Sequence, residues 1–313
     1  MIEVPGMAAA AQESALAQLL ARRLRIHTVH ESVVFLRSDS PVCRAEGLGT
    51  QVRVTVRFGA REIMATLYQV DGDALGLDEA GLSESAWKRL GLQDGDTVSI
   101  RQPHPLDSHS ALRRRIFGHR LDETSLCMVI SDIAAERYSD VHIGSFLTAC
   151  TTLPLDADET RALTRAMVGT GVQLSWPAEM VLDKHCVGGL PGNRTTPLVV
   201  AIVAAHGLTI PKTSSRAITS PAGTADTMET LAPVDLPIEH IRRVVDQEGG
   251  CVVWGGAMQL SPADDIMIRV QRALDLENAG QMVASVLSKK IAAGATHIVV
   301  DIPVGPTAKV RSA

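Results

Sequence analysis

The sequence has few aromatic residues and no long apolar run. Phe, Trp and Tyr make up only 3% of its 313 residues, so a hydrophobic core has to be built mainly from Leu, Val, Ile and Ala. No apolar stretch approaches the ~20 residues that a membrane-spanning helix needs. Hydrophobic residues make up 45% and charged residues 21% of the chain, which is the balance of a folded globular protein with more than one domain rather than a disordered one.

The cysteine pattern of a disulfide framework or a zinc site is also missing. The five cysteines are an odd number, and no CxxC or CxxH spacing occurs. This usage favours a reducing, cytoplasmic environment. The Ala-rich start contains Glu3 and Glu13 and has no basic segment before it, so we expect residues 1–20 to form an N-terminal extension rather than a signal peptide.

The charge balance does not favour polyanionic partners. With a formal net charge of -5, we expect no general affinity for nucleic acid or for an anionic membrane. Any phosphate chemistry therefore requires a local positive site.

Three zones of different patterning follow the extension. Residues 21–103 carry short alternating segments rich in Val, Ile and Thr, which predict a small β-barrel-like domain. Residues 104–175 carry apolar residues at helical spacing and predict an α-helical domain. Strands and helices alternate from 176 to 313, which is typical of an α/β domain with a mostly parallel sheet. Helices within about 263–293 are candidates to pack with the helical domain.

The first candidate site is the segment "VLDKHCVGGLPGNRTTP" at 181–197. A strand, a Gly-rich loop and a helix in succession can direct backbone N–H groups at an anion, although the spacing is not that of a Walker A loop. If the strand continues through the segment, Lys184 and Cys186 share one face and His185 lies on the other. Lys184 is then a candidate anion ligand, the alternative being an ordinary surface lysine.

The helix after this loop should begin near Thr195 or Thr196. Either hydroxyl can cap its first turn.

The second candidate site is the segment "PKTSSRAITSPAGTADTME" at 211–229. Its hydroxyl and basic side chains are Lys212, Thr213, Ser214, Ser215, Arg216, Thr219, Ser220 and Thr224. Such donors beside a helix that begins at Gly223-Thr224 suit a phosphate or ribose hydroxyls, whereas the alternative is a solvated turn. Because both segments follow consecutive strands, they should meet at the carboxyl edge of one sheet, where ligands bind in open α/β folds.

Two further features are less specific. Ser285 and Lys289 share a helix face, with Glu277 just before that helix, but an ordinary amphipathic helix with exposed lysines is an open alternative. Lys309 follows the last predicted strand, where a solvated lysine is common. The Asp264-Asp265 pair could act as paired acids or simply begin a helix.

These segments, together with "GGCVVWGGAMQLSPADD" and "MVASVLSKKIAAGATHIVVDIPVGPTAKV", resemble the thymidine phosphorylase family. Within it they resemble the branch that contains AMP phosphorylase and the bacterial type 2 thymidine phosphorylases, from about Leu24 to the end. The resemblance implies a β-barrel-like N-terminal domain, an α-helical domain and an α/β domain that close over a cleft. It also implies a homodimer or larger homo-oligomer packed through the helical domain, and no metal or organic cofactor. Family members continue past Lys309, so we expect the C-terminal part of the α/β domain to lie beyond Ala313.

The resemblance also implies roles for individual residues. The phosphate-binding set is Lys184, Cys186, Ser214 and Thr224, with Cys186 where the family often has Ser. The catalytic candidates are Glu277, where AMP phosphorylase has its Asp proton donor, His185 near the base, and Lys289. Contacts to the nucleoside or nucleotide fall on Gly189, Ser215, Arg216, Ala217, Ile218, Thr219, Ser220, Thr224, Arg269, Ser285 and Lys309.

The implied reaction is the attack of inorganic phosphate on a nucleoside. With thymidine it gives thymine and 2-deoxyribose 1-phosphate. One alternative is AMP phosphorylase chemistry, in which Arg216, Lys309 and the hydroxyls of 215–220 hold a 5′-phosphate and the product is ribose 1,5-bisphosphate. A second is a non-catalytic nucleotide-binding module. A third is anthranilate phosphoribosyltransferase-like chemistry with Asp264-Asp265 at a metal–diphosphate.

Overall fold

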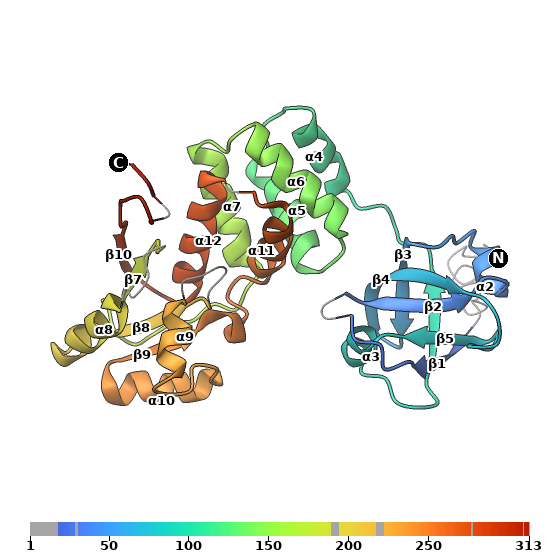
Figure 1. The fold of residues 1–313 in the computed structure, drawn as a ribbon, viewed down its shortest axis with the longest axis horizontal. Coiled ribbons are helices and arrows are strands. Elements are labelled where there is room, and N and C mark those ends of the chain that lie inside the picture. Colours follow the sequence, from blue (N-terminus) through green and yellow to red (C-terminus); the bar gives the residue numbers. More distant parts are fainter. Residues whose placement is uncertain are drawn as a thin grey trace, which may run out of the picture. The chain divides into compact units, whose positions relative to one another are not determined.

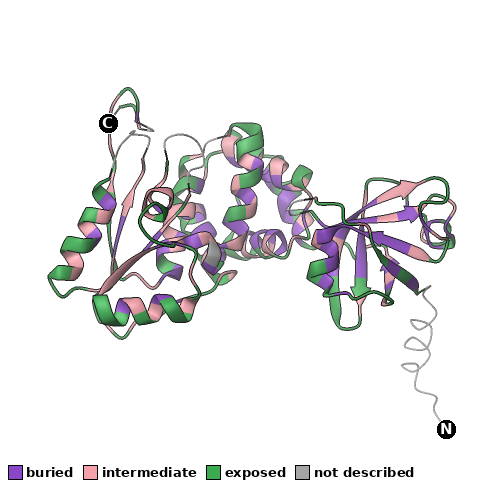
Figure 2. Cartoon of the chain, turned by 60° about the horizontal axis from the view of Figure 1, so that its bottom comes forward, coloured by how far each residue is buried: buried purple, intermediate pink, exposed green. Residues whose placement is uncertain are grey.

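The computed structural model describes residues 18–28, 31–188, 194–216, 222–276, 278–308 and 310–312. The chain divides into two compact units, 1–105 and 106–313. Each is described by itself (Figures 1 and 2). No helix among the described residues is long and apolar enough to cross a membrane.

The first unit is a closed barrel of six described strands in the order β1-β5-β2-β4-β3-β6, as the alternating pattern predicted. The strands are β1 (Leu19–Arg23), β2 (Val33–Arg37), β3 (Val52–Phe58), β4 (Arg61–Val70), β5 (Glu79–Leu82) and β6 (Thr97–Arg101), with helices α2 (Pro41–Ala45) and α3 (Glu84–Leu90) between them. Alternate Val, Leu and Ile side chains fill the interior. The pattern did not reveal β5, because its "EAGL" sequence is short and contains small residues, so it shows no period of two.

The second unit begins with a helical bundle. Its first helices are α4 (Ser108–Ile116), α5 (Glu123–Ala134), α6 (Asp140–Thr152) and α7 (Ala157–Gly169). Two helices from much later in the chain, α11 (Pro262–Leu274) and α12 (Ala279–Ala292), pack in the same core. Asp122, Ser139 and Asp156 each accept a backbone N–H at the start of a helix, which explains why α5, α6 and α7 begin where they do.

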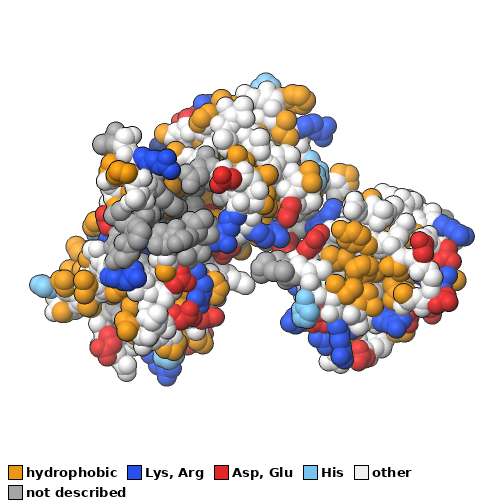
Figure 3. Space-filling model, in the orientation of Figure 1, with side chains coloured by type: hydrophobic (Ala, Val, Ile, Leu, Met, Phe, Trp, Pro, Cys, Tyr) orange, Lys and Arg blue, Asp and Glu red, His pale blue; other side chains and the backbone are white. Residues whose placement is uncertain are grey.

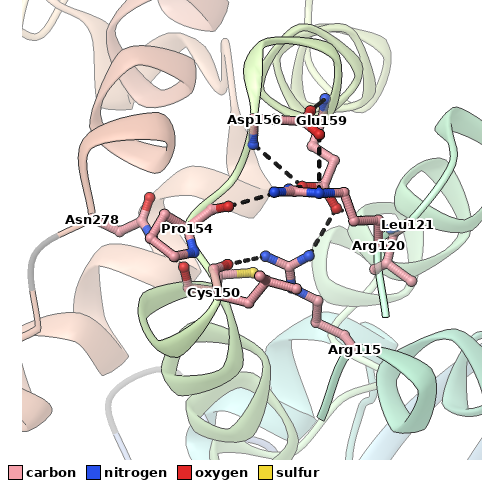
Figure 4. A network of polar contacts seen from close by, with 9 residues as sticks. Arg115, Arg120, Leu121, Cys150, Pro154, Asp156, Glu159 and Asn278 are labelled. Atoms are coloured by element: carbon pink, nitrogen blue, oxygen red, sulfur yellow. Dashed lines mark hydrogen bonds and ion pairs between the residues drawn. The ribbon is translucent and has the colours of Figure 1, made fainter. Parts of the chain in front are cut away.

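An ion pair is buried among these helices (Figure 4). The Arg115 side chain is inaccessible and lies 2.7 Å from Glu159 Oε1. Its second NH group donates to the Leu153 carbonyl, and Arg120 also binds Glu159. Glu159 further accepts the N–H of Leu121 at 2.9 Å. One carboxylate therefore fixes the approach of α4, the α4–α5 loop and the start of α7.

The remaining elements form a parallel sheet with helices. They are β7 (Leu182–Cys186), α8 (Thr195–Ala205), β8 (Ile210–Ser214), α9 (Thr224–Glu229), α10 (Ile238–Glu248), β9 (Gly250–Trp254), a 3-10 turn η2 (Gly255–Met258) and β10 (His297–Asp301). β10 pairs with β7 and β8 pairs with β9, all in parallel. A parallel bridge between Val181 and Thr209 joins the two pairs, so the order is β10-β7-β8-β9. The strands therefore end at one edge of the sheet, as predicted.

Apolar side chains remain exposed on α8 and β10. They include Leu198, Ile202, Ile298, Val299 and Val300, and Figure 3 shows the group over α8 at the left of the molecule. β10 has a neighbour on one side only within the described chain.

We predict that the buried ion pair of the bundle is needed for stability. Arg115→Met leaves the Glu159 charge without its buried partner and should lower the free energy of unfolding by about 3–5 kcal/mol. Arg161, which pairs with Asp158 on the surface of α7, provides the matched control, and Arg161→Met should leave the denaturation midpoint almost unchanged. Chemical denaturation followed by circular dichroism measures both. Equal midpoints for the two variants would contradict this assignment.

Candidate active site

The first cluster lies at the carboxyl end of β7. The strand runs through Lys184 to Cys186, so Lys184 and Cys186 share a face, as expected. The Lys184 Nζ donates to Asp301 Oδ2 of β10 at 2.8 Å and to Thr196 Oγ1 of α8 at 3.3 Å. Lys184 is only 5% exposed. It is therefore a buried cation with ordered partners, not the surface lysine of the alternative reading.

Asp301 was not singled out from the sequence, yet its carboxylate is the ionic partner of Lys184 in this cluster. Its hydrogen bond from Lys184 holds the pKa of the Asp301 carboxyl below its usual range, despite partial burial. The pKa of the Cys186 thiol is raised, mainly by burial and also by the Asp301 carboxylate. Cys186 is thus a neutral thiol, a weaker donor than the hydroxyl that the family often has there.

Thr196 has a different role from the one expected. The N-cap of α8 is Arg194, without a side-chain cap hydrogen bond, and Thr195 is the first residue of the helix. Thr196 is buried and its hydroxyl meets the Lys184 ammonium. The signal in the sequence was a hydroxyl in the first turn of a helix after a Gly-rich loop, which suits an anion site as well as a cap.

The second cluster lies at the end of β8. Ser214, the last residue of the strand, is half-buried and its hydroxyl donates to the Ser215 carbonyl at 3.3 Å. Ser215 is exposed. Thr224 is the first residue of α9, and Gly223 is its N-cap, as predicted. The Gly223 N–H donates to Asp226 Oδ2 at 2.8 Å.

Arg216 is already engaged by protein groups. Both NH groups of its guanidinium donate to the Glu229 carboxylate, and its Cζ lies 4.9 Å from the ring centroid of Trp254. The hydrogen bonds to Glu229 raise the pKa of Arg216, and Asp226 lies 3.6 Å away. A phosphate at Arg216 would have to compete with this bidentate pair.

The third cluster joins α11 and α12. Ser285 Oγ donates to Asp264 Oδ2 at 2.7 Å. Lys289 Nζ lies 2.6 Å from the same oxygen and 3.3 Å from Asp265 Oδ1. Burial disfavours the charge of Lys289, but Asp264 and Asp265 outweigh it and raise its pKa. The alternative of a plain amphipathic helix with an exposed Lys289 is therefore wrong.

A fourth cluster was missed by the sequence reasoning. Lys212 of β8, Asp183 of β7 and Lys290 of α12 are buried together, 3%, 3% and 5% exposed. Asp183 lies 3.0 Å from Lys290 Nζ and 3.7 Å from Lys212 Nζ. Lys290 Nζ also donates to the Thr213 carbonyl at 2.6 Å and to its Oγ1 at 3.2 Å. The doublet "KK" gave no sign that one lysine points to α11 and the other to the sheet.

The other predicted residues are placed less directly. His185 is half-buried on the face of β7 opposite Lys184. Arg269 pairs with Asp140 of α6 at 2.8 Å rather than with the Ser285 and Lys289 cluster. Several predicted contacts lie outside the described residues: Gly189, Ala217, Ile218, Thr219, Ser220, Glu277 and Lys309.

Comparison with protein families gives two matches. The helical bundle domain of the glycosyl transferase family matches residues 109–171. The a/b domain of the same family matches residues 178–313. Residues 172–177, between the two matches, lie between the end of α7 and the start of β7.

Curated relatives are similar over almost the whole chain. A protein named "Putative thymidine phosphorylase" from Chelativorans sp. (strain BNC1) is 62% identical over 294 residues, which are 94% of this chain and 58% of that protein. The protein of the same name from Parvibaculum lavamentivorans gives the same values. Another from Sphingopyxis alaskensis is 59% identical over 310 residues, which are 99% of this chain and 60% of that protein. The chain thus spans about three fifths of the length of these relatives.

Among solved structures, an anthranilate phosphoribosyltransferase from Thermus thermophilus is similar to the chain. The TM-score is 0.54 at 24% identity, over 61% of this chain and 58% of that one. The likeness concerns the fold alone.

We predict that Asp301 competes with an anion for Lys184. Asp301→Asn removes one negative charge beside the ammonium and should tighten the binding of inorganic phosphate by roughly tenfold. Isothermal calorimetry measures the dissociation constant, and Asp246→Asn on the exposed side of α10 is the matched control. Weaker binding in Asp301→Asn would instead mean that Asp301 positions Lys184 for its ligand.

Proposed function

We propose that this chain, which belongs to the glycosyl transferase family matched above, carries the phosphate and nucleoside sites of a pentosyltransferase that splits a nucleoside with inorganic phosphate. The preferred substrate is a pyrimidine nucleoside of the thymidine type, in accord with the names of its relatives. The products are the free base and a pentose 1-phosphate.

The observation that carries this proposal is the link between the two halves of the site. Lys290 donates to Thr213, and each of these residues is the neighbour of a candidate ligand contact, Lys289 on α12 and Ser214 on β8. The adjacency keeps the Ser285 and Lys289 cluster close to the strand end that carries the phosphate candidates. This contact joins the candidate anion cluster to the candidate base cluster, which supports the proposal because transfer of a sugar between base and phosphate needs both groups held together.

The anion half combines charge and hydroxyl donors. Lys184 supplies a buried ammonium group, and Thr196, Ser214 and Thr224 supply hydroxyls in the first turn of α8, at the end of β8 and at the start of α9. A phosphate held there can direct one oxygen at the anomeric carbon. The C–N bond then breaks through an oxocarbenium-like state, and the base departs with the bonding electron pair.

The departing base needs a positive charge or a proton. Lys289 suits the first role, because Asp264 and Asp265 keep it protonated, and a fixed cation stabilises negative charge that develops on the base. The proton donor is Glu277, by its resemblance to the Asp donor of AMP phosphorylase. His185 at the end of β7 is the second candidate for proton transfer.

The existing contacts of Arg216 favour a nucleoside over a nucleoside 5′-phosphate as the substrate. Its guanidinium is bound by Glu229 and stacked on Trp254. A second anion at Arg216 would have to break that pair, which makes AMP chemistry the less supported alternative.

The direct test is phosphate-dependent release of base from thymidine, uridine, AMP and CMP. We expect the pyrimidine nucleosides to be consumed only when phosphate is present, and Lys184→Met to abolish turnover because the anion loses its cation. Lys88→Met on the exposed side of α3 is the control. Preferential consumption of AMP would support the nucleotide alternative. Calorimetric binding of these ligands without turnover would support a non-catalytic module.

Lys289 should act on the rate more than on binding. Lys289→Met removes a charge that matters most when the base leaves, so kcat should fall by about 100-fold with a smaller change in KM. Because its pKa is raised, Lys289 stays protonated through neutral pH. Deprotonation of this group should therefore cause no loss of activity at pH values below the ordinary pKa range of a lysine. A limb near neutral pH that disappears in Lys289→Met would contradict this role.

A further inference from the structure

The buried cluster of Asp183, Lys212 and Lys290 has no part in the steps described above. Both carboxylate oxygens of Asp183 lack a hydrogen-bond donor within the described part of the chain. Their only ionic contacts there are the two ammonium groups. The ammonium groups donate instead to one backbone carbonyl, that of Thr213. The cluster is therefore held by charge, with one carboxylate shared between two lysines.

Charge counting singles out Lys212. Two protonated lysines and one carboxylate leave a net charge of one buried inside the protein, which is costly. Burial, together with the neighbouring Lys290, lowers the pKa of Lys212 well below its ordinary value, and Asp183 offsets only part of this. Cys251 on β9 stays a neutral thiol, because burial raises its pKa to about 12. Lys212 is thus the member of the cluster whose charge can change.

Lys212 also lies close to the anion half of the site. It precedes Ser214 by two residues on β8, so their Cα atoms are about 7 Å apart. Its ammonium group donates to the carbonyl of Thr213, the residue next to Ser214. Protein rather than water fills the space around Lys212, because the residue is buried. A dianion at Ser214 would therefore favour the protonated form of Lys212 strongly.

We propose that Lys212 is a charge-compensating and positioning residue of the phosphate site, which takes up one proton from solvent when a phosphate dianion binds at the end of β8. This inference rests on the proposed phosphorylase function, which supplies the anion. In the free protein, Lys290 is the nearer partner of Asp183, at 3.0 Å against 3.7 Å for Lys212. In the complex, the added proton on Lys212 supplies a second positive charge two residues before Ser214, while the bonds from Lys290 of α12 to Thr213 keep the strand end in place.

The linkage has a definite sign. Phosphate raises the pKa of Lys212, so binding takes up a proton at pH values between the free and the bound pKa. Phosphate affinity then falls as the pH rises through that window. The other groups that face Lys212 are Asp183, Lys290 and Cys251, from β7, α12 and β9.

The test is calorimetric titration of inorganic phosphate at about pH 8 in buffers of different ionisation enthalpy, which gives the protons taken up on binding. We expect the unsubstituted protein to take up about one proton more than Lys212→Met, and Lys212→Met to bind phosphate about tenfold more weakly. Lys212→Arg, always charged, should bind phosphate without the extra proton. Lys88→Met on the barrel should behave like the unsubstituted protein.

Equal proton uptake by the unsubstituted protein and Lys212→Met would overturn this inference and leave the phosphorylase proposal intact. Failure of the unsubstituted protein to bind phosphate would overturn both. If Lys212→Met does not fold, as judged by circular dichroism, Lys212→Gln replaces it. The unsubstituted protein alone then decides the question. Uptake of one proton requires the dissociation constant for phosphate to rise by up to about tenfold per pH unit. A dissociation constant that does not change with pH overturns the inference.

Discussion

The parallel pairing of β7, β8 and β10 is the constraint on which the candidate site depends. It ends the three strands at one edge of the sheet, and its register places Asp301 opposite Cys186. From that position the Asp301 carboxylate reaches the ammonium of Lys184. A slip of one residue in β10 would turn Asp301 to the other face. The Lys184–Asp301 contact of the candidate anion site therefore depends on strand register as much as on residue type.

The helix α12 connects this edge to the bundle. Consecutive residues of a helix point about 100° apart, so Lys289 and Lys290 serve different partners. Lys289 meets Asp264 and Asp265 on α11, whereas Lys290 meets Asp183 and Thr213 on the sheet. One turn of α12 thus contacts both the Asp264 and Asp265 cluster of α11 and the end of β8. This is the structural reason for treating the two clusters as one site.

Much of this architecture could be predicted from the sequence, because it follows from periodicity and local capping. The alternation around β3 and β4, the helical spacing of α5 and α7, and the strand–loop–helix order after β7 all appear in the structure. Pairings between distant elements could not be predicted. Asp301 and Lys184 lie 117 positions apart, and nothing in their local patterns couples them. Thr196 looked like a cap, since its hydroxyl suits either role.

We propose that the ends of β7 and β8 form a phosphate site. A crystal structure of the protein with inorganic phosphate tests it most directly. The account predicts one phosphate at this edge, with oxygens within hydrogen-bond distance of Lys184 Nζ and of the hydroxyls of Thr196 and Ser214. It also predicts that the Lys184–Asp301 contact lengthens relative to its present 2.8 Å. A phosphate bound elsewhere, with Lys184 still closed on Asp301, would contradict the account.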